Sequence, residues 1–87
     1  MWEIYEHKKL ICTIRKIPKN ILERYEIWKD IIQLSGPHAL RLIKGFHDET
    51  LSGKWEGFRS SRLNIQYRII YRVYKNELYV MVMEPHG

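Results

Sequence analysis

The chain has 87 residues, 45% of them hydrophobic and 13% aromatic, and a formal net charge of +5 at pH 7. A chain of this length folds as one domain with a single modest core, which excludes a second domain and a deep cofactor cleft. One cysteine excludes an internal disulfide, and without a signal peptide or an apolar run near the roughly 20 residues of a membrane span, we expect a cytoplasmic protein with no membrane partner.

The first half of the chain predicts a short strand followed by two helices. Residues 2–5 alternate as a brief opening strand does. Apolar residues recur at helical spacing in residues 10–17, where Cys12 is expected to be a buried, inert thiol. Pro18 suits the first turn of a second helix, which the Gly-Pro pair at 36–37 ends. We expect the two helices to pack antiparallel, joined by a short link.

The second half of the chain predicts strands. A short helical turn at residues 38–44 and a polar loop at 45–53 precede a stretch in which the apolar period changes to two. We expect strands over residues 55–62, 64–74 and 78–83. A tight hairpin turn joins the last two strands.

These elements predict an α+β fold in a single domain, residues 1–87. Two N-terminal antiparallel helices pack on one face of a small, mainly antiparallel β-sheet, and the other face stays open to a ligand. The core face of the central strand is expected to carry Ile65, Tyr67, Ile69, Tyr71 and Val73. Arg68, Arg72 and Tyr74 fall on its open face.

Basic residues concentrate in the second half of the chain. Between residues 54 and 75 there is one acid, Glu56, against Lys54, Arg59, Arg62, Arg68, Arg72 and Lys75. Such a cluster attracts phosphates or an acidic protein. Trp55 and Phe58 could stack on exposed bases, although core packing is the simpler expectation for Trp55. The open strand face therefore favours RNA as its ligand.

The catalytic inventory of the chain is arginine and histidine. The sequence lacks the Cys/His spacing of a metal site, a phosphate-binding P-loop and a dinucleotide-binding glycine pattern, so we expect no metal and no cofactor. Metal-free cleavage of RNA can run on this inventory, because the ribose 2′-OH supplies the nucleophile. Arginine neutralises the charge that grows on the phosphoryl oxygens, and imidazole moves a proton near neutral pH.

One run of motifs resembles a known family. In chain order the run consists of Leu51-x-Gly53-x-Trp55, Arg59-Ser60-Ser61-Arg62, Tyr67-Arg68-Ile69-Ile70-Tyr71 and Pro85-His86. It resembles the RelE/ParE superfamily of bacterial toxins, and within it the HigB, RelE and YafQ-type messenger-RNA interferases. The resemblance covers most of the chain, since the helices ahead of the sheet also fit. It implies a metal-independent endoribonuclease that cuts messenger RNA in the ribosomal A site of a bacterium.

The resemblance also implies roles for single residues. Arg68 matches the arginine that stabilises the phosphate and the transition state, and His86 matches a general acid or base after the last strand. His47 lies where the YafQ-like branch has a histidine. The residues expected to bind RNA are Lys54, Arg59 and Arg62 by resemblance, and Arg72 and Tyr74 on the open strand face. Two positions depart from that branch, because Gln66 replaces a functional carboxylate and Val82 replaces an arginine.

The sequence therefore leads us to expect the toxin of a type II toxin–antitoxin system. Its expected partners are a cognate antitoxin, of the HigA-like helix-turn-helix kind, and the ribosome with its messenger RNA. Operator DNA is reached only through the antitoxin complex. Two alternatives stay open: a ParE-like toxin that binds DNA gyrase, and an inactive module that serves only antitoxin binding and operator repression.

Overall fold

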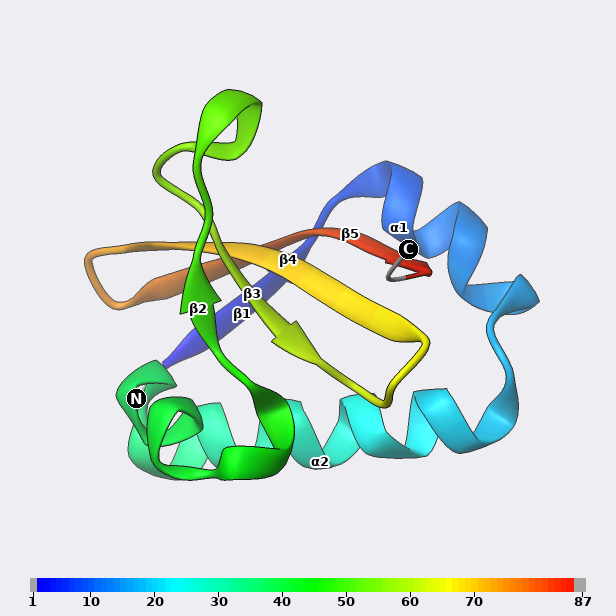
Figure 1. Cartoon of the computed structure of the whole chain (residues 1–87), viewed down its shortest axis with the longest axis horizontal. Coiled ribbons are helices and arrows are strands. Elements are labelled where there is room, and N and C mark those ends of the chain that lie inside the picture. Colours follow the sequence, from blue (N-terminus) through cyan, green and yellow to red (C-terminus); the bar gives the residue numbers. More distant parts are fainter. Residues whose placement is uncertain (1, 86–87) are drawn as a thin grey trace.

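A mixed five-stranded β-sheet in the order β1-β5-β4-β3-β2 forms the centre of the computed structural model, which describes residues 2–85 (Figure 1). Its strands are β1 (Glu3–Glu6), β2 (Glu49–Thr50), β3 (Arg59–Arg62), β4 (Tyr67–Tyr74) and β5 (Glu77–Pro85). The helices are α1 (Lys8–Thr13) and α2 (Lys19–Ser35), with short 3₁₀ helices at Ile14–Lys16, Pro37–Leu42, Lys44–Phe46 and Gly53–Trp55. No helix within residues 2–85 combines the length and apolar character that crossing a membrane requires.

Helix α2 covers one face of the sheet and supplies the centre of the core. It starts after Pro18 and ends at Gly36, whose φ of 86° lies in the left-handed region that glycine tolerates. The Trp28 ring meets Tyr71 of β4 edge-on, with the ring centroids 5.3 Å apart. The fully buried residues that surround this contact are Ile21, Tyr25 and Ile32 from α2, and Ile69, Leu78 and Val80 from the sheet.

The two helices do not form the antiparallel pair expected from the sequence. Helix α1 is six residues long and lies against β5, and the chain then passes along one side of the molecule before α2 begins (Figure 1). Leu10 is the one buried residue of α1, while Ile11 is 54% exposed. Cys12 is exposed too, so the expectation of a buried thiol is wrong. Because Leu10 is the one buried residue of α1, this helix packs on β5 and has little apolar surface left to pack on α2.

The sheet is mixed because β1 pairs parallel with β5, whereas the other three strand pairs are antiparallel. The opening, central and final strands are confirmed as β1, β4 and β5. The strand expected over 55–62 begins only at Arg59, because Gly53 and Gly57 turn the chain with φ values of 67° and 92°. Strand β2 was not predicted, since two residues are too few to establish a period. Residues 51–58, which connect β2 to β3, form an arm that rises beyond the sheet (Figure 1).

The apolar face of the central strand is shorter than expected. The side-chain oxygen of Asn64 accepts hydrogen bonds from the backbone N–H groups of Gln66 and Tyr67, both at 2.7 Å, and this turn delays the start of β4 to Tyr67. Ile65 therefore lies in the turn and is 87% exposed instead of buried. Val73, next to the hairpin, is 36% exposed.

A buried carboxylate fastens the arm to the sheet. The Asp48 side chain, just before β2, is 0% exposed. One of its oxygens accepts from Arg59 Nε at 2.8 Å and lies 2.7 Å from Arg59 Nη2. Its other oxygen accepts from Ser61 Oγ at 2.6 Å and from the Tyr71 hydroxyl. A buried charge is costly unless it is fully paired. The attachment of the arm to the sheet therefore depends on hydrogen-bond donors from both β3 and β4.

The Tyr71 hydroxyl makes the stability of the folded state depend on pH. Burial, and then the hydrogen bond to Asp48, raise the pKa of Tyr71 above its ordinary value. The folded state therefore opposes ionisation of this phenol. The stability that results is complete below about pH 10 and is lost as the pH rises beyond that value.

We predict that Tyr71→Phe lowers the free energy of unfolding at pH 7 by about 1–2 kcal/mol, because Asp48 loses a donor. The same change should make the loss of stability between about pH 9 and 11 shallower than in the wild type. Urea unfolding across this range measures both effects. Tyr74→Phe, on an exposed residue of the same strand, is the control. A Tyr71→Phe protein with the wild-type stability at pH 7 would contradict the role of the hydroxyl.

Candidate functional site

Strand β4 separates a buried face from an exposed face, as its alternation predicts. Ile69 and Tyr71 belong to the core under α2 and are fully buried. Arg68 and Arg72 alternate with them and lie on the other face, with Ile70 between them. Ile70 is also buried but stands outside the main core cluster, so it forms an apolar floor between the two arginines.

A β-bulge in β5 decides which residue faces Arg68. The pairing changes from Tyr71 opposite Val80 to Ile70 opposite Val82. Met81 is therefore an extra residue in β5. Without it, Arg68 would lie opposite Met83. With it, Arg68 lies opposite Glu84.

Arg62, Arg68 and Glu84 form a charged row across β3, β4 and β5 on the exposed face. Arg68 Nη2 lies 3.3 Å from Glu84 Oε2, and the Arg68 Nε–H is buried without a hydrogen-bond partner among the described residues. Arg62 forms no ion pair within residues 2–85. Side chains directly opposite each other on a sheet have Cβ atoms about 5 Å apart, so the two guanidinium groups repel. One carboxylate for two arginines leaves this charged row net positive and able to bind an anion such as phosphate.

The other residues predicted to bind RNA lie apart from the charged row. Arg72 is on the same face as Arg68 but four residues away, about 13 Å along a strand, so the two arginines would contact different phosphates. Tyr74 follows Arg72 at the hairpin end of β4, and Lys54 is exposed near the tip of the arm. Arg59 lies on the opposite, buried face, where it pairs with Asp48.

Of the two histidines expected in the site, His47 is described and His86 lies outside the described residues. His47 is exposed and has a left-handed φ of 44°, after the 3₁₀ helix Lys44–Phe46. It precedes β2 by two residues, at the end of β2 that the register places toward Arg62. His47 therefore lies at the same end of the sheet as the charged row. No group of three or more His, Cys, Asp or Glu side chains within residues 2–85 is arranged to hold a metal ion.

Trp55 and Phe58 pack on each other on the arm, with ring centroids 5.2 Å apart and planes at 77°. Trp55 is half-buried and outside the main core cluster, so the expectation that it packs in the core is wrong. Gly53 and Gly57 turn this segment away from α2. Phe58 points to the exposed face, where its ring centroid is 5.8 Å from Arg72 Cζ.

Sequence reasoning missed two carboxylates that the fold brings to arginines. Counting back from the hairpin pairs Arg68 with Met83, and only the bulge brings Glu84 opposite Arg68. Asp48 stands in a polar stretch of sequence, where a solvated carboxylate is the ordinary expectation. No pattern in the chain marks either pairing in advance.

Solved structures match nearly the whole chain, although no protein-family model and no curated protein matches its sequence. YafQ from E. coli strain BL21(DE3) has a TM-score of 0.81 at 14% identity, over 99% of this chain and 94% of that one. A chain of the archaeal RelE–RelB complex from Pyrococcus horikoshii OT3 has a TM-score of 0.77 at 23% identity, over 99% and 96%. A chain of the YoeB–YefM complex from Staphylococcus aureus has a TM-score of 0.74 at 18% identity, over 100% and 99%.

The chain has the same fold as YafQ, RelE and YoeB. The resemblance found in the sequence is thereby confirmed at the level of the fold. In this fold, the first three motifs of the run lie on the arm, on β3 and on β4. The charged row occupies the face of these strands that α2 leaves open.

Arg59 and Arg68 should contribute differently to folding. Arg59→Ala leaves buried Asp48 without its cation and should lower the free energy of unfolding by about 3 kcal/mol. Arg68→Ala removes a longer, partly exposed pair and should change it by less than about 1 kcal/mol. Urea unfolding of both variants beside the wild type measures the difference. Equal losses would show that Arg68 serves folding and would contradict its assignment to a ligand site.

Proposed function

We propose that the protein is the toxin of a type II toxin–antitoxin system and cleaves messenger RNA bound in the ribosomal A site. The observation that carries this proposal is the placement of Arg62 directly opposite Arg68 on the exposed face. Two guanidinium groups at this separation repel, and a phosphodiester bound between them offsets the repulsion. The likeness in fold to YafQ, RelE and YoeB supports RNA as the source of that phosphate.

In this proposal the RNA supplies its own nucleophile. The ribose 2′-oxygen bonds to the adjacent phosphorus and the bond from phosphorus to the 5′-oxygen breaks, which leaves a 2′,3′-cyclic phosphate and a 5′-hydroxyl. Arg68 binds the non-bridging oxygens, where negative charge grows, through its guanidinium group, and the side chain is 26% exposed. The supporting contacts to the RNA backbone come from Lys54, Arg62, Arg72 and Tyr74.

Two proton transfers complete the proposed reaction. Glu84 takes the proton of the 2′-OH, since its Oε2 is 3.3 Å from Arg68 Nη2 and therefore adjacent to the bound phosphate. Glu84 then supplies the carboxylate that Gln66 cannot. His86 protonates the leaving 5′-oxygen, a role that rests on the sequence resemblance, and His47 is the alternative acid at the same end of the sheet. Arg59 is assigned to holding Asp48 instead of RNA.

The proposal includes a cognate antitoxin that keeps the protein inactive in the bacterial cytoplasm. The matching RelE and YoeB chains come from complexes with RelB and YefM, which supports a protein partner of this kind. The net charge of +5 suits an acidic segment of that partner. A HigA-like helix-turn-helix protein would also connect the complex to operator DNA, which this chain then reaches only indirectly.

Arg68→Ala should reduce cleavage of messenger RNA on purified translating ribosomes by about 10²–10³-fold, because a donor to the developing charge is lost. Primer extension of the messenger RNA measures the cut. Lys19→Ala, which removes an exposed positive charge from α2, should cleave like the wild type. In the same assay Glu84→Gln should cleave about 10²–10⁴-fold more slowly, as expected for loss of a general base.

Each result separates the candidates. Full cleavage by Arg68→Ala would remove Arg68 from the mechanism, and full cleavage by Glu84→Gln would return the base role to a histidine. Wild-type protein that leaves ribosome-bound messenger RNA intact but stops DNA supercoiling by gyrase would establish the ParE-like alternative. Wild-type protein that does neither would establish the inactive antitoxin-binding module.

A further inference from the structure

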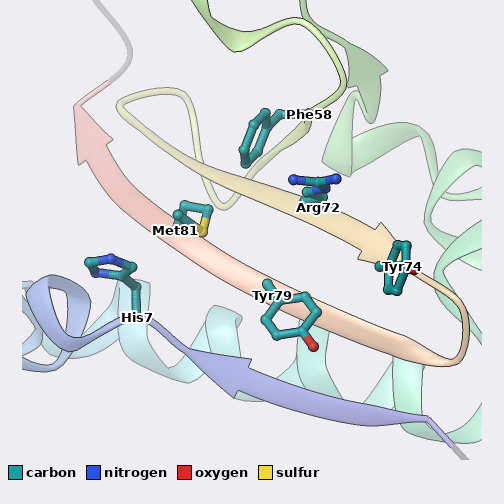
Figure 2. A pocket seen from close by; sticks show the side chains of 6 residues that line it. All are labelled: His7, Phe58, Arg72, Tyr74, Tyr79 and Met81. Atoms are coloured by element: carbon teal, nitrogen blue, oxygen red, sulfur yellow. The ribbon is translucent and has the colours of Figure 1, made fainter.

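The exposed face of the sheet carries a hollow of about 490 Å³ beside the hairpin end of β4 (Figure 2). Its lining residues are His7, Phe58, Arg72, Tyr74, Tyr79 and Met81. They come from the β1–α1 connection, the arm, β4 and β5, so the hollow exists only in the folded chain. Sequence reasoning gave no role to His7, Tyr79 or Met81.

The Tyr79 ring of this hollow is held on one side by Tyr5 and through its own hydroxyl group. The Tyr79 ring stacks on Tyr5, with centroids 5.3 Å apart and planes at 18°. The Tyr79 hydroxyl donates to Glu77 and the Tyr5 hydroxyl donates to Glu3, each at 2.5 Å. Tyr5 thus supports one side of the Tyr79 ring, and a flat ligand can use the other.

Donors and a positive charge stand around these rings. Arg72 is exposed on the β4 side and forms no ion pair within residues 2–85. On the β1 side, His7 Nδ1 accepts from the backbone N–H of Lys9 at 3.1 Å, so a neutral His7 ring carries its proton on Nε2 as a donor. Met81, the bulge residue, lies between His7 and Arg72 (Figure 2).

We propose that this hollow binds a nucleobase of single-stranded RNA beside the segment held by Arg68. The inference rests on the proposed function and extends it to a second contact on the same strand. A base stacks on aromatic rings without regard to its identity, and RNA recognition favours unstacked single strands for this reason. Arg72 binds the phosphate next to that base on the β4 side, while Glu3 and Glu77 keep the backbone away from the β1 side.

The charge around the hollow favours RNA over an apolar protein segment. Arg72 Cζ lies 5.8 Å from the Phe58 ring centroid, and Lys75 Nζ lies 5.5 Å from the Tyr74 ring centroid. Rings with cations beside them suit a ligand that is both flat and anionic. Arg68 and Arg72 also point from one strand about 13 Å apart, so a single RNA strand running along β4 reaches both.

Fluorescence anisotropy tests this site with a short labelled RNA whose 2′-hydroxyls are methylated, so that it binds but is not cut. Tyr79→Leu keeps apolar bulk but removes the ring, and it should weaken binding about 5- to 100-fold. Arg72→Gln should reduce the slope of log affinity against log salt by about 0.7, the value for one phosphate contact on a single strand. Lys19→Gln removes an equal charge from α2 and should not change the affinity. His7 is left intact because it caps α1.

Thermal unfolding first establishes that each variant is folded. If Tyr79→Leu does not fold, RNA binding by Arg72→Gln decides the outcome. If Arg68→Ala weakens RNA binding while Tyr79→Leu and Arg72→Gln bind like the wild type, the hollow is not a base-binding site and the proposed function stands. If the wild-type protein does not bind the RNA, the base-binding role of the hollow is also refuted. The cleavage assay on ribosomes then tests the proposed function separately. If Tyr79→Leu and Arg72→Gln keep RNA binding but lose the complex with the cognate antitoxin, the hollow is a protein-docking site instead.

Discussion

The extra residue Met81 in β5 is the constraint on which the exposed face depends, because it changes which residues of that strand face the core. Before the bulge, Leu78 and Val80 point to the core. After it, Met83 takes that direction and Glu84 turns to the exposed face opposite Arg68. The main core cluster stays continuous, since Met83 pairs with Ile69. One inserted residue therefore places a carboxylate beside the central arginine, and the inserted Met81 itself lines the hollow.

Two arginines on neighbouring strands illustrate how the fold separates stability from ligand binding. Arg59 faces a carboxylate that is 0% exposed, so the charge of Arg59 is needed to keep the arm attached to the sheet. Arg68 has a single, longer contact with a partly exposed carboxylate, and it lies opposite a second positive charge. An arrangement of the second kind adds little to folding. It gains most when an anion binds, which is the property that a site for RNA requires.

Much of this architecture was readable from the sequence, and the parts that were not share a physical cause. The period of two in Tyr67–Tyr74 predicted both faces of β4, and the period of 3.6 predicted α2. The position of α1 was not predictable from its sequence pattern, because it depends on the tertiary contacts of one residue, Leu10. Trp55 left the core because two glycines redirected the arm, and Glu84 reached Arg68 only through a bulge. Local pattern determines the faces of an element, whereas register and turn geometry determine which of those faces meet.

In the proposed reaction, the exposed face acts on RNA whose own 2′-OH is the nucleophile. The most direct measurement uses ribosomes carrying a messenger RNA with a single 2′-deoxy sugar at the position that the protein otherwise cuts. Cleavage at that position should disappear, and the unmodified RNA should yield a 2′,3′-cyclic phosphate and a 5′-hydroxyl. Continued cleavage at the deoxy position, or products that carry a 5′-phosphate, would show that the 2′-OH is not the nucleophile.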